Sequence, residues 1–140
     1  MSLKDDILAY VTKHDYVSFA ELSRLPGFGS GDFALCVPNM GEAVYWAGLS
    51  EEAAHALSDL VREGQVHYWL ASSVLIYFID GCTLKLPLVK QARVYKTPHW
   101  LPVTICRGHG SDHPKHGEEW KKRHARLPEL KKAIAASASA

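Results

Sequence analysis

Apolar residues near the start of the chain recur at helical spacing. Leu3, Ile7, Leu8 and Val11 fall on one face, and charged residues occupy most of the opposite face. This pattern predicts an amphipathic helix that ends near His14.

A second, shorter helix is predicted after a brief extended piece at residues 16–17. Ser18 and Glu21 match the capping box, in which the two side chains bond reciprocally to backbone amides at a helix start. The helix is expected over residues 19–25, because the proline and glycine at residues 26–27 stop it.

The clearest pattern covers residues 50–63 and predicts a third helix. Ser50 is a suitable N-cap, Arg62 lies in the last turn where a cation is favoured, and Gly64 can adopt the left-handed conformation that ends a helix. One face is apolar: Ala53, Ala54, Leu57, Leu60 and Val61.

Directly after this helix, two stretches have the composition of β-strands. Residues 66–71 and 74–79 are rich in β-branched and aromatic residues, and only Ser72 and Ser73 separate them. We therefore expect a tight hairpin. Residues 83–86 are expected to form a further strand.

The segment between the second and third helices, residues 26–49, is too long for a turn of three or four residues. It begins with a glycine-rich stretch, and then residues 33–37 and 43–47 have strand composition. We expect an inserted hairpin or an ordered loop. In an alternative register, residues 44–46 would form a short strand that pairs with the hairpin at 66–79.

The predicted strand at residues 74–79 is apolar on both faces and therefore requires cover on both sides. Residues 33–47 and residues 92–106 are the candidates for this cover. In the second of these segments, Pro98 and Pro102 are expected to limit regular structure.

The order of helix, short strand, helix, helix and hairpin resembles a winged helix-turn-helix domain over about residues 3–80. The resemblance implies an α+β fold with an inserted hairpin or loop at residues 26–49. It predicts a winged-helix-like domain over residues 1–106, followed by a basic, histidine-rich extension over residues 107–140 that is partly helical or flexible. Winged helices read DNA, and they also dock proteins, so the resemblance alone leaves the function open.

Charge divides the chain into two parts of opposite sign. Residues 1–84 contain four basic and eleven acidic residues, a net charge of −7, whereas residues 85–140 contain twelve basic and four acidic residues, a net charge of +8. Such asymmetry favours a basic segment that meets a polyanion, or one that folds back onto an acidic body. The basic candidates for nucleic-acid contact are Lys85, Lys90, Arg93, Lys96, Lys121, Lys122, Arg123 and Arg126.

In a DNA-reading winged helix, the third helix enters the major groove. His55, Ser58 and Arg62 are its candidate contacts in this chain. The same face carries several carboxylates, however, and these repel phosphate. The alternative interpretation is a solvated helix face or a surface that docks a protein.

A run of potential metal ligands begins near the predicted domain boundary: Cys106, His109, His113 and His116. Thiolate and imidazole are the ligands that zinc prefers, so these residues are a candidate zinc site. A polar loop rich in histidine is the simpler interpretation, and no cofactor is expected. A metal-dependent nuclease centre using Asp112 is the weakest interpretation, because no second acidic motif accompanies that residue.

The remaining features narrow the class of protein. No apolar run approaches the roughly 18 to 20 residues of a membrane span, the N-terminal residues lack the pattern of a secretory signal, and three widely spaced cysteines favour free thiols in a reducing compartment. We expect a cytoplasmic, non-enzymatic protein that binds DNA and resembles a transcription regulator. The alternative is an interaction module that docks a protein partner or forms a homodimer through the acidic helix or the aromatic wing.

Overall fold

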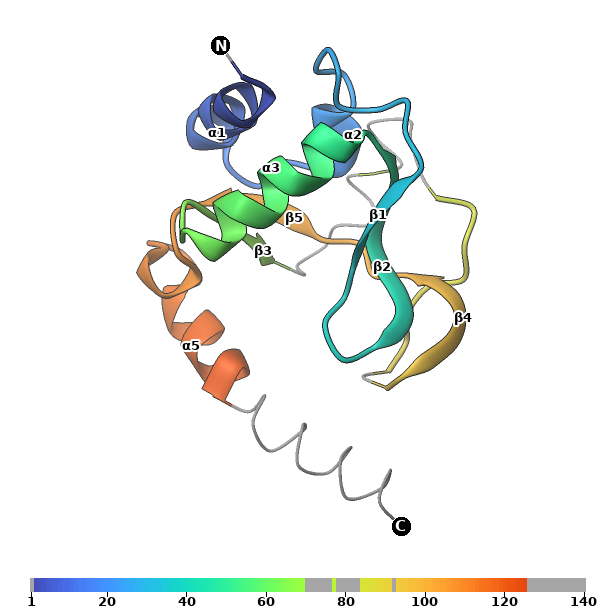
Figure 1. Cartoon of the computed structure of the whole chain (residues 1–140). Coiled ribbons are helices and arrows are strands. Elements are labelled where there is room, and N and C mark those ends of the chain that lie inside the picture. Colours follow the sequence, from blue (N-terminus) through green and yellow to red (C-terminus); the bar gives the residue numbers. More distant parts are fainter. Residues whose placement is uncertain (1, 70–76, 78–83, 92, 126–140) are drawn as a thin grey trace.

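The computed structural model describes residues 2–69, 77, 84–91 and 93–125, and it shows a mixed α+β fold (Figure 1). The three predicted helices are present. They are α1 (Leu3–His14), α2 (Phe19–Leu22) and α3 (Glu51–Arg62).

Side-chain caps begin α2 and α3 as the sequence predicts. Ser18 and Glu21 form the complete capping box of α2, and the Ser50 hydroxyl accepts a hydrogen bond from the Ala53 amide at the start of α3. Helix α2 is shorter than predicted. The Ser23 hydroxyl donates to the Ala20 carbonyl, and such side-chain bonds to the backbone compete with continued helix.

The segment between α2 and α3 contains the expected hairpin, β1 (Phe33–Cys36) and β2 (Gly41–Leu49), paired antiparallel. The other edge of β2 pairs in parallel with β4 (Tyr95–Trp100). The alternative register, in which residues 44–46 pair with the wing, is therefore wrong. Gly41 is required here, since its φ is +61° and a Cβ would collide with the Tyr95 carbonyl.

A second, two-stranded sheet lies beneath α1 and α3. In it β3 (Val66–Trp69) pairs antiparallel with β5 (Thr104–Arg107), and Val17 forms a bridge to Ile105 on β5. The predicted partner of the first wing strand was residues 74–79. Of that range only Tyr77 is described, and its backbone is helical rather than extended. Residues 70–71 and the remainder of the predicted second strand lie outside the described residues.

Two other strand predictions also need correction. Residues 84–86 are not extended, and the remaining residue of that predicted strand lies outside the described part. The expectation of little regular structure at residues 92–106 is wrong, because β4 and β5 both lie there. Pro98 is tolerated inside β4 because the strand lies at a sheet edge and its register is irregular between the pairs made by Tyr95 and His99.

Tyr77 connects the parts of the hydrophobic core. Its fully buried hydroxyl accepts a hydrogen bond from the Phe19 amide (2.8 Å) and donates one to the Val103 carbonyl (2.9 Å). The Tyr77 ring packs against Trp46 and Trp100, with ring centroids 5.3 and 5.0 Å away. Both segments predicted to provide cover, residues 33–47 and 92–106, therefore contribute an aromatic side chain.

The C-terminal segment folds back onto this body. A 3-10 turn, η1 (Gly110–Asp112), precedes α5 (Gly117–Ala125), which agrees with the partly helical extension predicted for residues 107–140. Residues 126–140 lie outside the described part. Among the described helices, none has the length and apolar composition that crossing a membrane requires.

Candidate functional site

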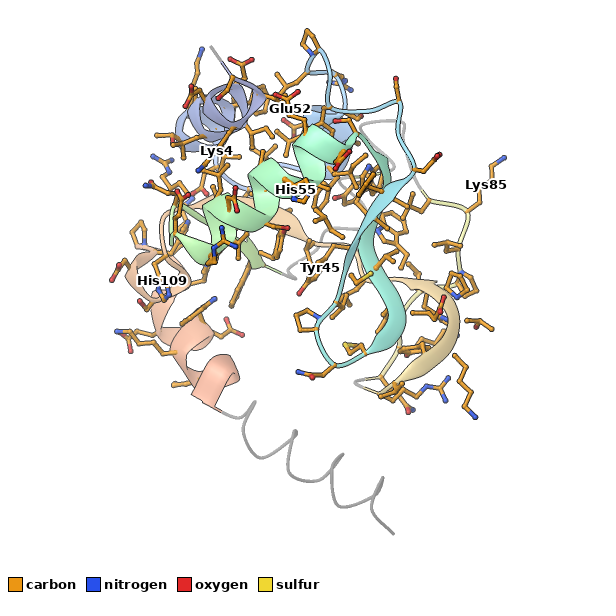
Figure 2. All side chains as sticks on the ribbon, in the orientation of Figure 1. Lys4, Tyr45, Glu52, His55, Lys85 and His109 are labelled. Carbon is orange, nitrogen blue, oxygen red and sulfur yellow. The ribbon has the colours of Figure 1, made fainter. Side chains whose placement is uncertain are left out.

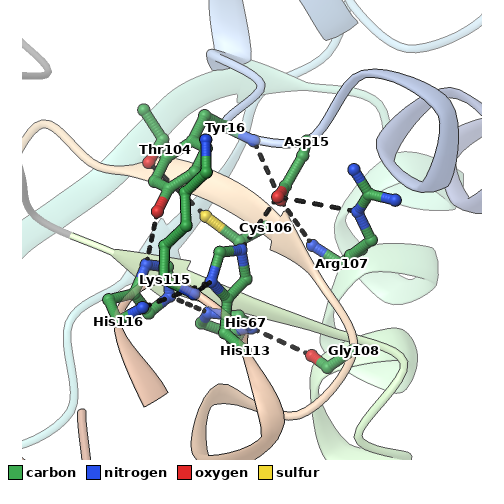
Figure 3. Close-up of polar contacts among 10 residues, drawn as sticks. All are labelled: Asp15, Tyr16, His67, Thr104, Cys106, Arg107, Gly108, His113, Lys115 and His116. Atoms are coloured by element: carbon green, nitrogen blue, oxygen red, sulfur yellow. Dashed lines mark hydrogen bonds and ion pairs between the residues drawn. The ribbon is translucent and has the colours of Figure 1, made fainter. Parts of the chain in front are cut away.

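Polar side chains from separate segments meet beside the C-terminal end of α1 (Figure 3). Three histidines and one cysteine among them are buried, each with less than a tenth of its surface exposed to solvent. Buried polar groups need partners, so this group, here named the Cys–His cluster, is the first candidate site. Its members are Asp15, His67, Cys106, His113 and His116.

The backbone brings these side chains together in two ways. His67 and Cys106 are directly opposed in the ladder between β3 and β5. Asp15 is the C-cap of α1, and both it and Tyr16 have positive φ angles of 54° and 46°. Such conformations are costly for residues other than glycine, and they occur where the surrounding structure requires a particular side-chain position.

The potential ligand atoms form two overlapping sets of three, each with all atoms within 4.8 Å of one another. The first set is His67, Cys106 and His116, and the second is Asp15, Cys106 and His113. The Cys106 sulfur belongs to both. A thiolate with imidazoles and a carboxylate is a donor set that fits zinc.

Hydrogen bonds fix the orientation of two of the imidazoles. His67 Nδ1 lies 2.9 Å from the Gly108 carbonyl, an acceptor, so this nitrogen carries the proton in the neutral ring. His116 Nδ1 lies 2.7 Å from the Tyr16 hydroxyl. The Nε2 atoms of these two histidines face each other at 2.7 Å.

His113 is held differently. Its Nδ1 accepts hydrogen bonds from the Lys115 and His116 amides at 3.1 and 3.4 Å, so its proton is on Nε2. That Nε2 donates to Asp15 Oδ2 at 2.8 Å. Asp15 Oδ1 accepts the Arg107 amide at 3.0 Å. His113 therefore orients the Asp15 carboxylate.

The buried environment favours the neutral form of two imidazoles, those of His67 and His116. Burial lowers the pKa of His67, and burial together with the neighbouring His113 and His67 lowers the pKa of His116 to about 4. Burial opposes ionisation of Asp15, but hydrogen bonds from His113 and from the Arg107 and Tyr16 amides outweigh it and lower the pKa of Asp15. Neutral imidazole and ionised carboxylate are the forms that bind metal ions.

Cys106 is unsuited to act as a nucleophile without a metal. Its side chain is fully buried, and this burial raises the pKa of the thiol to about 12. The thiolate is the reactive form of cysteine, so a buried neutral thiol is inert. The cluster is therefore suited to ligation rather than covalent catalysis.

The structure places the residues of the predicted run of ligands differently from one another. Cys106, His113 and His116 are brought together, but His109 is not. Its ring packs edge-on against Trp120, and its Nδ1 accepts a hydrogen bond from the Ser111 amide. Asp112, the residue of the proposed nuclease centre, belongs to neither described set of ligands.

Sequence reasoning missed His67 and Asp15. The alternation along β3 places His67 on the same face as Trp69, whose ring stacks on His116 at 4.0 Å. That alternation was a usable signal for His67. The position of Asp15 depends on an unusual backbone conformation, and the sequence contains no comparable signal for it.

The exposed face of α3 presents the predicted His55, Ser58 and Arg62, but its cations are paired with carboxylates. Arg62 contacts Asp59, and Lys4 of α1 bonds to Glu63 at 2.6 Å. Figure 2 shows Glu52 and His55 projecting from this helix. The face is consequently acidic.

The other predicted basic residues occupy two exposed sets. Among the described residues, none of Lys85, Lys90, Arg93, Lys96 or Lys122 has a carboxylate partner. Arg93 lies over the Tyr95 ring, 4.7 Å from its centroid. We name the sets the β4 cations (Lys85, Lys90, Arg93, Lys96) and the α5 cations (Lys121, Lys122). Arg123 belongs to α5, and Arg126 lies outside the described residues.

A cavity of about 500 Å³ opens between α3, the β1–β2 hairpin and the start of α5. Ser58 and Arg62 line it from α3, facing the aromatic side chains of Tyr45, Tyr68 and Trp120. Two of the three predicted contact residues of α3, Ser58 and Arg62, thus lie beside aromatic side chains, whereas His55 does not line the cavity.

Comparison with known proteins adds no relative: no protein-family model matches the chain, and no curated protein or solved structure matches it.

Proposed function

We propose that this chain is a nucleic-acid-binding protein of winged-helix type, with DNA as its partner and a role like that of a transcription regulator. The order α1, Val17, α2, α3, β3 and β5 supports the fold assignment, with β5 in the place of the second wing strand. In this proposal, the β1–β2 hairpin is an insertion between the second and third helices.

The observation that carries the proposal is the difference between the cations of the two surfaces. Arg62 and Lys4 near α3 are paired with carboxylates, whereas the β4 cations are exposed and have no carboxylate partner among the described residues. Unpaired lysine and arginine side chains are available to neutralise phosphates and release counterions.

Aromatic groups that line the cavity support contact with bases as well as phosphates. Tyr45, Tyr68 and Trp120 lie there beside Arg62, whereas the Tyr95 ring is buried and covered by Arg93. Bases stack on aromatic rings without strong sequence preference, so single-stranded DNA is a suitable ligand in addition to duplex. Ser58 and Arg62 would contact the strand from the cavity edge.

The test is a titration of the full chain against fluorescent duplex and single-stranded DNA at low and moderate salt. We expect binding that weakens steeply as salt rises. The double variant R93Q/K96Q should bind more weakly, and the slope of log affinity against log salt for duplex should fall by about 1.8 for two lost phosphate contacts.

The matched control is K13Q/R24Q, which removes one lysine and one arginine charge from exposed positions in the N-terminal half. It should leave affinity nearly unchanged if the β4 cations make the contact. Equal loss in both double variants would mean that only net charge matters, and absence of any salt-dependent affinity in the wild-type chain would refute the proposal.

A second candidate function follows from the acidic face of α3. Glu51, Glu52 and Glu63 are exposed there, and such a surface suits a basic protein partner or a second copy of this chain. In this case E51Q/E52Q would weaken self-association or capture of the partner, and DNA affinity would be absent. Sedimentation of the wild-type and variant chains at several concentrations distinguishes a homodimer from a monomer.

A further inference from the structure

We propose that His67, Cys106 and His116 bind one zinc ion, and that the Asp15 carboxylate, which lies in the overlapping set with Cys106 and His113, moves to complete a tetrahedral site. The proposed nucleic-acid function does not require this site. Metal titration tests the zinc site, and DNA titration tests the nucleic-acid function.

The hydrogen-bond partners separate ligand histidines from other histidines. A metal-bound histidine donates its other ring N–H to an oxygen acceptor, which fixes the ring. His67 meets this condition through Gly108, and His116 meets it when its Nδ1–H donates to the Tyr16 hydroxyl. The Nε2 atoms of both rings then point their lone pairs at the same place.

His113 and His109 fail the same condition. In each ring Nδ1 accepts a backbone amide, from Lys115 and from Ser111 respectively, so the proton is on Nε2. An Nε2 that carries a proton has no lone pair for a metal. His113 instead donates to Asp15, which is the usual role of a group that orients a ligand carboxylate.

Charge favours Asp15 as the fourth ligand. The Cys106 thiolate and the Asp15 carboxylate together carry two negative charges, which balance the zinc ion in a buried position. A neutral site avoids the cost of burying net charge. Zinc accepts sulfur, nitrogen and oxygen ligands together in tetrahedral geometry, so this mixed set fits it better than magnesium or calcium.

The ion requires only small movements in the first ligand set. With zinc–nitrogen bonds of about 2.0 to 2.1 Å, two tetrahedral nitrogens lie roughly 3.3 Å apart. The present separation of the two Nε2 atoms is 2.7 Å, so the rings would separate slightly. Cys106 loses its thiol proton to solvent, and neutral His116 carries its single ring proton on Nδ1.

The burial of the cluster indicates a structural role for the ion. His67, Cys106 and His116 are each less than a tenth exposed, and Trp69 stacks on His116. A catalytic zinc keeps an open position for water or substrate, whereas a structural zinc is enclosed by protein ligands. The ion would link the C-terminal segment to the end of α1 and to the two-stranded sheet formed by β3 and β5.

The test uses the full chain, freed of metal by a chelator and titrated with Co²⁺ and then with Zn²⁺. We expect one Co²⁺ per chain with thiolate-to-cobalt charge-transfer absorption, and loss of that absorption as Zn²⁺ displaces it. C106S should lose the absorption, and C36S, with an exposed cysteine replaced, should keep it. Binding without thiolate absorption, or no stoichiometric binding by the wild-type chain, would overturn the proposal.

Histidine variants distinguish this ligand set, which contains His67, from the set predicted from the sequence, which contains His109. H67Q should weaken zinc binding more than about a hundredfold, whereas H109Q should bind like wild type. Loss in H109Q with retention in H67Q would overturn the assignment. If H67Q does not fold, H109Q and the wild-type absorption still decide the matter. D15N should retain thiolate absorption with zinc affinity about tenfold lower, and unchanged affinity would exclude Asp15 as a ligand.

Discussion

The Cys–His cluster and the β4 cations use polar side chains in opposite ways. In the cluster, His67, His113 and His116 are buried and bonded to one another or to the backbone. The β4 cations are exposed and have no carboxylate partner among the described residues. A buried polar group must satisfy its hydrogen bonds within the protein, whereas an exposed cation remains available to an outside ligand.

This difference predicts where substitutions act. Replacing a buried group leaves its former partner unsatisfied, which costs about 1–3 kcal/mol, so variants of the cluster should lose stability. Exposed charges contribute little to stability, so variants of the β4 cations should lose binding without unfolding. Separate measurements of unfolding and of DNA affinity therefore distinguish the role of the Cys–His cluster from that of the β4 cations.

The largest expected effect is that of zinc removal on stability. A ligand that binds only the folded state at a free concentration a thousandfold above its Kd stabilises it by about 4 kcal/mol. For a chain of this size, that corresponds to a fall in Tm of roughly 10 °C on chelation. Differential scanning calorimetry of the zinc-loaded and chelated full chain measures it. H109Q should show the same fall, and C106S should show none.

A smaller effect is expected where α5 docks beside the cluster. The indole ring of Trp120 packs directly on Gly110, so the Cβ of G110A would force the ring to move. Such overpacking costs about 1–3 kcal/mol, and denaturant unfolding measures it. G29A is the matched control, because a Cβ at Gly29 meets nothing within 4 Å. Its stability should stay within about 0.5 kcal/mol of wild type.

The helices were predictable because their signals are local. The capping box at Ser18, the N-cap at Ser50 and the left-handed Gly64 each act within one helical turn, and all three are present. The pairing of β3 was not predictable in the same way. Its partner strand is distant, with Trp69 and Thr104 35 positions apart, while a two-serine turn offered a closer candidate.

The cluster was predictable in composition but not in membership. Three of its residues, Cys106, His113 and His116, belong to one short run in the sequence. His67 joins them only through the β3–β5 ladder, and Asp15 joins through a positive φ angle at the end of α1. Spacing along a chain cannot reveal ligands that tertiary structure brings together, so the run suggested His109 instead.

A third prediction tests whether the surface near the cluster also binds nucleic acid. Lys121 and Lys122 are exposed on α5. Loss of two phosphate contacts should weaken duplex binding at low salt, and the fall in affinity between 50 and 200 mM salt should be about tenfold smaller than for the wild type. K121Q/K122Q should show this loss in fluorescence anisotropy while its Tm and zinc content stay at wild-type values. A fall in zinc content would show that the α5 cations and the Cys–His cluster are coupled, so that binding and stability could not be changed separately.

A further effect, expected only above pH 10, concerns the cavity between α3, the β1–β2 hairpin and the start of α5. Burial raises the pKa of Tyr45 to about 12, and it raises the pKa of Tyr68 as well. An unfolded tyrosine ionises near pH 10, so the unfolded state loses protons first as the pH rises. Stability supplied by neutral Tyr45 is therefore complete below pH 10 and is lost between about pH 10 and 12, at roughly 1 kcal/mol per pH unit, and Tyr68 contributes a loss in the same direction. Denaturant midpoints measured across this range should fall less steeply in Y45F. The Tyr45 and Tyr68 ring centroids lie only 4.4 Å apart, so the variant tests each ring separately. If the pH dependence of the denaturant midpoint is unchanged in Y45F, then only Tyr68 is shielded from water, and the cavity is open to water at Tyr45.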